Sequence, residues 1–406
     1  MDNKNAKKLL VLMMSMTYFV SYITRINYGA IISEMVEDTG FSETMLSMAL
    51  TGNFIAYGLG QIVSGFLGDK FSPKKLVSLG LIVTVCMNLL IPVCANPYQM
   101  LVVWCINGFA QAFMWPPLVK IMSGSLTSDE YKKSIVKVSW GSSFGTILIY
   151  LIAPVFISLA GWKSVFVFSA VCGAIMIFVW NFGMAKLPFV TQNVQPDKLK
   201  SDSSKVTKKS FMSVVLVGIM LAIVLQGMLR DGVTTWMPSY IKSTYNLGTE
   251  ISILTGVVLP VFSIFCFNFT SSIYRKKFSN PMTCAAVLFG CGAVSSLCVA
   301  LFTGKSVILS VLFSALLTGA MHGVNLMLIS MIPPFFEKRG NVSTVSGVLN
   351  SCTYVGSAIS TYGMAVLNSH YGWGFTVCIW AVIAVCGTLV CLLCIRPWLK
   401  QMEILK

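Results

Sequence analysis

Long apolar segments are the feature that most constrains how this chain can fold. Twelve can be marked, each of about 20 residues or more, and a helix of that length crosses the hydrocarbon core of a bilayer. Hydrophobic residues make up 56% of the chain and charged residues only 11%, which is too little charge for a soluble domain of this length. The sequence therefore predicts an all-α integral membrane protein with twelve transmembrane helices. The segments cover approximately 9–33, 45–68, 76–95, 98–123, 134–159, 164–185, 211–236, 249–273, 282–304, 307–335, 342–368 and 374–395.

One polar stretch interrupts the short loops between these segments. Residues 186–210 hold six lysines and a middle rich in Ser and Asp, with no apolar periodicity. This composition is typical of a linker. We therefore expect an N-terminal six-helix bundle at 1–185, a cytoplasmic linker at 186–210 and a C-terminal six-helix bundle at 211–406.

The two halves repeat one another. The turns Gly161-Trp162 and Gly372-Trp373 are 211 residues apart, and the polar positions of the helices before them share that offset. Those positions are Ser139, Ser143, Thr146 and Tyr150 in one half, and Asn350, Tyr354, Ser357 and Thr361 in the other. Several matches at one offset indicate a duplicated unit. Two such pseudo-symmetric six-helix bundles describe the major facilitator architecture.

The basic residues indicate how the chain lies in the membrane. Most of the 29 lysines and arginines fall at the N-terminus, in the loops after every second segment and at the C-terminus, whereas the opposite loops hold only Lys163, Lys242 and Lys305. By the positive-inside rule, both termini are cytoplasmic and the protein is a multi-pass protein of the plasma membrane. The net charge of +15 is then a topology signal, and we expect no binding of nucleic acid.

Two arginines lie within apolar segments at equivalent places in the two halves. Arg25 follows Tyr18 and Tyr22 at helical spacing, so one face carries two phenols and a guanidinium. Arg230 lies at a similar depth in the first segment of the second half. Because an arginine in the bilayer costs about 2.5–3.5 kcal/mol on insertion scales, we expect both to bind an anionic substrate. The alternative is that both lie near helix ends and extend to the lipid headgroups.

Acidic residues are nearly absent from the segments. Only Asp231 falls inside one, and since adjacent helical residues point apart, we do not expect it to be the simple partner of Arg230. The guanidiniums are then expected to be largely uncompensated and to bind phosphate oxygens in pairs. Without an anion, these uncompensated charges would hinder the transporter from switching between its two open states. This favours a mechanism that exchanges one anion for another. Tyr57, Gln61, Trp115 and Gln226 are further candidates for substrate binding, while Asp231 and His322 are the candidate proton sites.

The loop after the second segment reads Gly65-Phe-Leu-Gly68-Asp69-Lys70-Phe-Ser-Pro-Lys74-Lys75. It resembles the major facilitator signature Gly-x-x-x-Asp-Arg/Lys-x-Gly-Arg-Arg/Lys, with Ser72-Pro73 in place of the usual Gly region. The resemblance implies that Asp69 caps a neighbouring helix end and pairs with cations in one conformation. Asp69 and Lys70 are therefore predicted to act in gating rather than in binding.

The chain as a whole is similar to the organophosphate:phosphate antiporters of the major facilitator superfamily, the relatives of the bacterial glycerol-3-phosphate and hexose-phosphate transporters. The resemblance is densest in Tyr22-x-x-Arg25, Ile55-Ala-Tyr57-Gly58, Asn107-Gly-Phe-Ala-Gln-x-x-x-Trp115-Pro-Pro and Leu229-Arg230-x-Gly232-x-x-x-Trp236-x-Pro238. It implies that Arg25 and Arg230 hold the phosphoryl group of the substrate. It also assigns the family's site tyrosines to Tyr18, Tyr22 and Tyr57.

Several positions depart from that family. The glycerol-phosphate and hexose-phosphate carriers have a lysine where this chain has Gln61 and another basic residue where it has Ile26. Ser142 stands where the glycerol-phosphate carrier has a histidine, and Asp231 stands where the family commonly has tyrosine. These differences imply a less positive site than in the relatives.

The leading hypothesis is a secondary transporter that exchanges a small phosphate ester for inorganic phosphate. Two alternatives stay open: a proton-coupled symporter of an organic anion such as a sugar acid, with Asp231 as proton site, and a membrane sensor of sugar phosphate. We expect no enzyme, no cofactor and no metal site, because no nucleotide loop, metal-ligand spacing or nucleophile–base pair stands out. The architecture usually works as a monomer.

Overall fold

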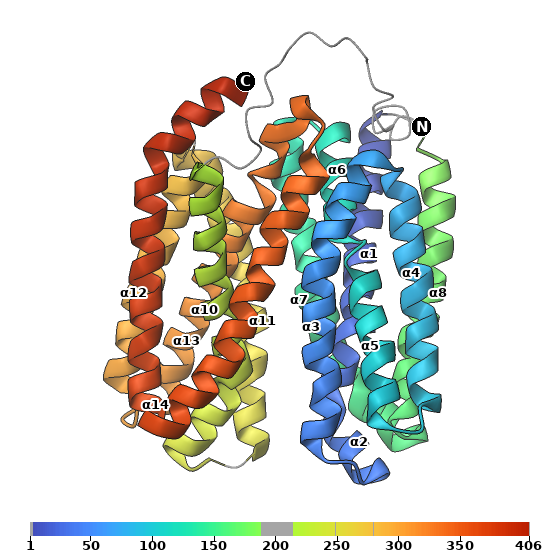
Figure 1. Cartoon of the computed structure of the whole chain (residues 1–406), viewed down its shortest axis with the longest axis vertical. Helices are drawn as coiled ribbons and strands as arrows, with labels where there is room; N and C mark the ends of the chain where they lie inside the picture. Colours follow the sequence, from blue (N-terminus) through green and yellow to red (C-terminus); the bar gives the residue numbers. More distant parts are fainter. Residues whose placement is uncertain (1–2, 188–213, 248, 279, 406) are drawn as a thin grey trace. The chain divides into compact units, whose positions relative to one another are not determined.

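The structure is a computed structural model, and it describes residues 3–187, 214–247, 249–278 and 280–405. Within these residues every regular element is helical (Figure 1). The chain divides into two compact units. The first unit comprises Met1–Lys198 and Phe336–Ser351, and the second comprises Leu199–Phe335 and Cys352–Lys406. The predicted linker lies outside the described residues from position 188 onward.

Each predicted segment of the first unit overlaps a helix, but the bounds differ in three places. Segment 9–33 runs into a second helix, 76–95 extends through a 3-10 helix at Ile91–Val93, and 98–123 is divided between two helices. The helices are α1 (Asn3–Ala30), α2 (Ile32–Thr39), α3 (Glu43–Lys70), α4 (Pro73–Leu90), α5 (Pro97–Gln111), α6 (Trp115–Ser125), α7 (Ser128–Ala160) and α8 (Lys163–Ala185). The break between α5 and α6 precedes Pro116 and Pro117. Proline lacks the N–H that a continuing helix needs, but it is favoured in the first turn of a new one.

The second unit repeats this plan over the predicted segments of the C-terminal half. Its helices are α10 (Val214–Tyr245), α11 (Thr249–Lys277), α12 (Pro281–Phe302), α13 (Val307–Asn325) and α14 (Val342–Leu405). A π-helical turn at Leu326–Ser330 and a 3-10 helix at Pro333–Arg339 follow α13. The first residues of α14, up to Ser351, belong to the first unit, and the rest belong to the second.

The corner glycines confirm that the two halves share a backbone plan. Gly161 ends α7 with φ 73° and ψ 172°, and Gly372 interrupts α14 with φ 74° and ψ 174°. These angles lie in a region that only glycine enters readily. Gly372 thereby divides α14 into the two helices that the sequence predicts at 342–368 and 374–395.

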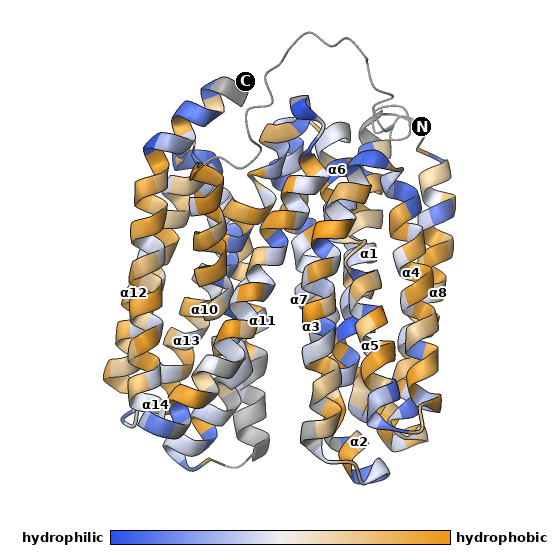
Figure 2. Cartoon of the chain, in the orientation of Figure 1, coloured by the Kyte–Doolittle hydropathy of each residue, from blue (hydrophilic) through white to orange (hydrophobic). Residues whose placement is uncertain are grey.

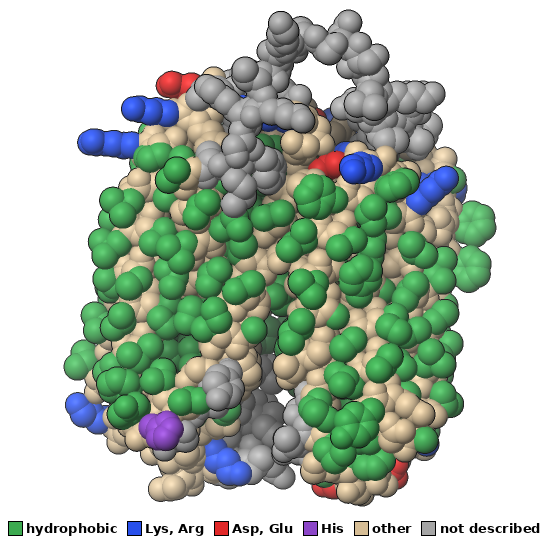
Figure 3. All heavy atoms as spheres, in the orientation of Figure 1, with side chains coloured by type: hydrophobic (Ala, Val, Ile, Leu, Met, Phe, Trp, Pro, Cys, Tyr) green, Lys and Arg blue, Asp and Glu red, His purple; other side chains and the backbone are tan. Residues whose placement is uncertain are grey.

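The outer surface of the helices is apolar, as a lipid environment requires. By length and hydropathy alone, the described residues contain nine helices that could cross a membrane. Large side chains such as Leu159, Phe182 and Leu393 are exposed. Hydrophobic residues run along the helices (Figure 2), and on the visible face the lysines and arginines gather at helix ends (Figure 3). The surface therefore carries the apolar side chains that a soluble protein would bury.

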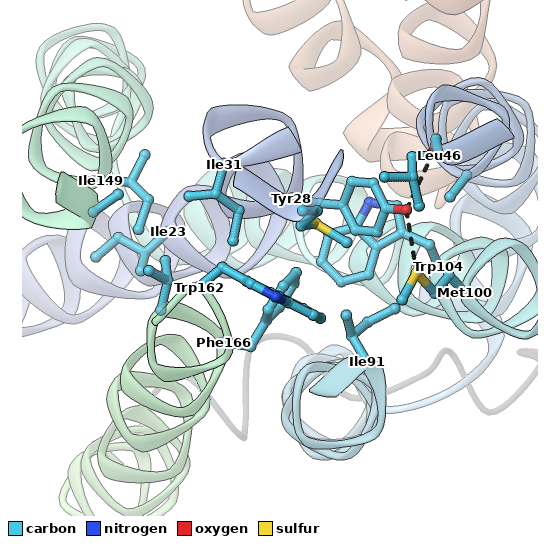
Figure 4. Close-up of a cluster of buried hydrophobic side chains, with 14 residues drawn as sticks. Ile23, Tyr28, Ile31, Leu46, Ile91, Met100, Trp104, Ile149, Trp162 and Phe166 are labelled. Carbon is cyan, nitrogen blue, oxygen red and sulfur yellow. Dashed lines mark hydrogen bonds between the residues drawn. The ribbon is translucent and has the colours of Figure 1, made fainter. Parts of the chain in front are cut away.

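An aromatic cluster fixes one end of α1 within the first unit (Figure 4). The ring of Tyr28 lies 5.2 Å from that of Trp104 on α5, and Trp104 meets Phe166 of α8 edge to face at 5.8 Å. The Tyr28 hydroxyl donates to the carbonyl of Leu46 at 3.2 Å, which ties α1 to α3. Since Arg25 lies less than one turn away, this cluster helps to set its position.

Candidate functional site

Arg25 is buried within the first unit between two tyrosine rings. Its guanidinium carbon lies 4.2 Å from the ring centre of Tyr22 on α1 and 4.6 Å from that of Tyr57 on α3, and only 7% of the residue is exposed. A guanidinium is attracted to the negative faces of such rings, with an energy of roughly 0.5–2 kcal/mol per contact. The side chain is therefore held inside the unit and does not extend to lipid headgroups, which rules out that alternative for Arg25.

Two further aromatic residues extend this group. Tyr18 meets Tyr22 edge to face at 5.1 Å and lies 4.9 Å from Trp115, the first residue of α6. The Trp115 indole nitrogen is buried, and no described residue accepts its hydrogen bond. The structure thus gathers five predicted binding residues from α1, α3 and α6. We call Tyr18, Tyr22, Arg25, Tyr57 and Trp115 the Arg25 cluster.

The backbone beneath Arg25 is held by amides of neighbouring helices. The Thr24 carbonyl accepts from Asn88 of α4 at 3.1 Å and from Asn107 of α5 at 3.3 Å. The Thr24 hydroxyl accepts from Gln111 at 2.8 Å, and Asn27 donates to Asn88 at 2.7 Å. These contacts bury polar groups with their partners and fix α1 next to the charged residue.

Gln61 lies one turn beyond Tyr57 on α3 but is engaged elsewhere. It is fully buried, and its amide nitrogen donates to the Ala112 carbonyl, at 3.4 Å, in the break between α5 and α6. Its amide oxygen has no donor among the described residues. Gln61 therefore supports the broken backbone, and a direct role in substrate binding stays a prediction.

In the second unit, Arg230 forms a two-point ion pair with Asp231. The distances are 2.6 Å from Nε to Oδ1 and 2.8 Å from Nη2 to Oδ2. The expectation that Asp231 would not be the partner of Arg230, and that the guanidinium would be largely uncompensated, was wrong. Adjacent Cβ atoms do point apart on a helix, but the arginine side chain is long enough to curl back onto its neighbour. The fork geometry then favours the carboxylate.

Ser357 of α14 completes this arrangement. Its hydroxyl donates to Oδ2 of Asp231, the oxygen that also accepts from Arg230 Nη2. Asp231 is thus held from two helices of the second unit. We call Arg230, Asp231 and Ser357 the Arg230 triad.

Gln226 and His322 make contacts that join α13 to α10 and α11. Gln226, one turn before Arg230, is fully buried and donates to the Met321 carbonyl at 3.1 Å. His322 packs its ring edge to face against Phe267 of α11 at 5.4 Å. These contacts join helices and do not test a role in transport. Substrate binding by Gln226 and proton coupling by His322 therefore stay predictions.

Asp69 caps the start of α14 inside the first unit, as the loop signature implied. Its two carboxylate oxygens accept from the backbone amides of Ser343 at 3.0 Å and Thr344 at 2.7 Å. Lys120 of α6 lies 3.3 Å from the same carboxylate and donates to the carbonyls of Gly68 and Asp69. The cation at Asp69 is therefore Lys120, whereas Lys70 is exposed. The close approach of α3 to the start of α14 needs glycine at position 65, because a Cβ there would lie 2.8 Å from the Ser343 carbonyl oxygen.

Some of these residues were absent from the sequence-based site. Ser357 was visible only as part of a repeated polar face, and Lys120 could have been found as a lysine inside the apolar segment 98–123. The amide contacts to Thr24 leave no signal of their own, because they depend on how α1, α4 and α5 pack.

Comparison with known proteins decides the family. Residues 14–361 match the Major Facilitator Superfamily. This chain belongs to that superfamily. A probable hexose phosphate transport protein of Chlamydia muridarum is 22% identical over 94% of this chain and 88% of its own length. The glycerol-3-phosphate transporter of Bacillus subtilis is 26% identical over 57% of this chain and 56% of its own.

A solved structure shows the same fold. The proton:xylose symporter XylE, bound to 6-bromo-6-deoxy-D-glucose, superposes with a TM-score of 0.78 over 95% of both chains, at 12% sequence identity. The predicted fold class of two six-helix bundles is thereby confirmed. The chain is a multi-pass membrane transporter of this superfamily.

Proposed function

We propose that this transporter exchanges a small organic phosphate ester for inorganic phosphate by alternating access. The observation that carries the proposal is the burial of Arg25 in a prepared aromatic group, at a place in the first half that corresponds to Arg230 in the second. The names of the hexose phosphate and glycerol-3-phosphate relatives support a phosphorylated substrate. From the distribution of lysine and arginine, we place the protein in the plasma membrane with both termini cytoplasmic.

In this proposal Arg25 binds the phosphoryl group through two parallel hydrogen bonds. Charge-assisted bonds of this kind are worth about 1.5–3 kcal/mol each, more than a single contact with a tyrosine ring. The N–H groups of a guanidinium lie in its plane, so they bond to phosphate oxygens while the rings of Tyr22 and Tyr57 hold the group in place both with and without the anion. The indole N–H of Trp115 and the phenol of Tyr18 belong to the same cluster and would bond to the ester portion of the substrate.

Arg230 takes part with its charge already balanced by Asp231. The ion pair uses the Nε–Nη2 edge of the guanidinium, and Nη1 is not part of it. The Ser357 hydroxyl gives the carboxylate a second partner, so Asp231 can withdraw from Arg230 without losing every hydrogen bond. The Arg230 triad thus offers the substrate a weaker positive field than a lone arginine would.

The test is counterflow in vesicles that contain the purified full-length chain. Vesicles loaded with unlabelled phosphate are given labelled phosphate, and a panel of phosphate esters and carboxylates competes from outside. We expect phosphate esters to compete and to drive efflux of internal phosphate. Competition by carboxylates alone would contradict the proposal.

The Arg230 triad also favours a second candidate, proton-coupled symport of an organic anion. An arginine that pairs with its own neighbour leaves no uncompensated charge there when the substrate is absent. The return of the empty carrier is then less hindered, and protonation of Asp231 would free Arg230 for the substrate. Uptake into vesicles that lack internal anion, driven by an inward proton gradient, would support symport. Strict dependence on internal phosphate would support exchange.

A further inference from the structure

The first unit has a groove that is separate from both arginines. It has a volume of about 950 Å³, and all the helical residues that line it come from α1 and α7. The two helices pack closely at Gly141, where a Cβ would lie 2.7 Å from the Ser15 carbonyl. None of the residues of the Arg25 cluster or of the Arg230 triad lines it.

One end of the groove is basic and the rest is apolar. Lys7, Lys8, Lys133 and Lys137 line the basic end, together with Glu130. Beyond them the lining is mainly apolar: Val11, Leu12, Met16, Phe19, Phe144, Ile147, Leu148 and Leu151. The positions recur every three or four residues on both helices, so each helix contributes one continuous face.

The charge at the basic end is only partly balanced. Lys7 bonds to both carboxylate oxygens of Glu130, at 2.8 and 3.0 Å, which joins the start of α1 to the start of α7. Among the described residues, no acidic group lies within ion-pair distance of Lys8, Lys133 or Lys137. The attraction for an anion at this end therefore comes from the three lysines.

We propose that this groove holds one anionic phospholipid of the surrounding bilayer. The phosphate would lie among Lys8, Lys133 and Lys137, and an acyl chain would follow the apolar faces of α1 and α7. From Lys8 to Phe19 the groove rises about 16 Å along α1, close to the depth of one leaflet. Basic pockets between transmembrane helices suit such headgroups. The chain's own linker does not fit, because residues 186–210 are themselves basic.

The experiment measures which lipid stays with the protein. The full-length protein is reconstituted in nanodiscs that contain equal amounts of phosphatidylglycerol and phosphatidylcholine with the same acyl chains. It is then extracted in mild detergent, and retained lipid is counted by native mass spectrometry. We expect one phosphatidylglycerol per chain in preference to phosphatidylcholine. Equal retention of the two lipids would overturn the proposal.

Two pairs of variants locate the site. K133Q/K137Q should lower retention of phosphatidylglycerol roughly tenfold, whereas K276Q/K277Q, which removes two exposed lysines at the end of α11, should not change it. Equal losses in both, or no loss in the first, would overturn the proposal.

L12W should fill the apolar part of the groove and lower retention of phosphatidylglycerol. L79W should not, although Leu79 on α4 is about as exposed as Leu12 (52% against 53%). Unchanged retention in L12W would overturn the groove as the binding site. A single monodisperse peak and an unchanged melting temperature show that each variant is folded.

Discussion

Arg230 and Asp231 are neighbours in the chain and also partners in a two-point ion pair, with Nε 2.6 Å from Oδ1 and Nη2 2.8 Å from Oδ2. The second unit thus supplies a counterion for its own arginine. In both candidate functions, the strength of this pair sets how readily the empty carrier returns. A variant at Asp231 can therefore distinguish exchange from symport.

Replacing Asp231 with Asn removes the counterion and keeps a hydrogen-bond acceptor for Ser357. If the protein is an exchanger, D231N should bind phosphate esters more tightly, by roughly tenfold for one charge-assisted interaction. It should also lose any uptake into vesicles without internal anion. Both are measured from the concentration dependence of labelled phosphate flux. Uptake that persists in D231N but no longer responds to a proton gradient would instead identify Asp231 as the proton site.

Replacing Arg25 with Lys should reduce exchange at least about a hundredfold. An ammonium is a point charge and cannot make the two parallel bonds of a guanidinium. The measurement is the initial rate of phosphate exchange per unit of folded protein in vesicles. The matched control is R396K, because Arg396 is exposed near the end of α14. A rate in R25K close to that of R396K would contradict the role of Arg25.

The ring of Tyr57, rather than its hydroxyl, should matter for holding Arg25. Tyr57→Phe keeps the aromatic face 4.6 Å from the guanidinium, and Tyr57→Leu removes it. Loss of one buried cation–π contact, worth about 1–2 kcal/mol, corresponds to a rise in KM of roughly five- to thirtyfold for Y57L. We expect a KM near that of the wild type for Y57F. A larger defect in Y57F than in Y57L would show that the hydroxyl carries the function.

Thr24→Val tests whether the amide network supports the Arg25 cluster. The substitution keeps the shape of the side chain but removes the oxygen that accepts from Gln111 at 2.8 Å. Leaving that buried amide without its partner should cost about 1–3 kcal/mol and lower the melting temperature. T17V is the control, because the buried Thr17 hydroxyl bonds only to the Met13 carbonyl of its own helix. Equal melting temperatures for T24V and T17V would argue against the network.

Asp69→Ala should weaken the attachment of the first turn of α14 more than Asp69→Asn. Alanine removes both acceptors for the amides of Ser343 and Thr344, whereas asparagine keeps one oxygen and loses the charge that faces Lys120. Loss of a cap costs about 0.5–2 kcal/mol, so thermal unfolding should report a lower melting temperature in D69A. If Asp69 acts in gating, exchange should slow in both variants while the affinity for phosphate stays unchanged. A melting temperature in D69A equal to that of the wild type would show that the cap is dispensable.

Much of the architecture could be predicted from periodicity and spacing. Segment lengths define the helices because a bilayer fixes how many apolar residues a helix needs, and the constant offset between Gly161 and Gly372 reveals the duplication. Arg25 and its aromatic neighbours could be grouped because helical spacing aligns Tyr18, Tyr22 and Arg25 on one face. Tyr57 and Trp115 were further candidates from their own segments, and the family resemblance also assigned Tyr57 to the site.

The remainder depends on details that spacing does not encode. The ion pair between Arg230 and Asp231 was not predicted, because the rule for adjacent helical residues concerns the direction of Cβ and not the reach of a long side chain. Lys120 gave no clear signal because it lies near the end of the segment 98–123, where a lysine can also extend to the lipid headgroups. The bond from Gln61 to the Ala112 carbonyl has no signal in the spacing either, because that carbonyl is available where Pro116 lacks the N–H of a continuing helix.

The matching corners at Gly161 and Gly372 put the residues of α7 and α14 in register, and this register exposes an asymmetry. Ser357, which donates to Asp231, corresponds to Thr146. The Thr146 hydroxyl donates to the Ser142 carbonyl of its own helix. The Ser357 hydroxyl, which also lies 2.9 Å from the Thr353 carbonyl of its own helix, reaches an acid on a second helix, whereas Thr146 bonds within its own helix. The two halves therefore share a backbone plan, but only the second uses this position to hold an acidic side chain between two helices.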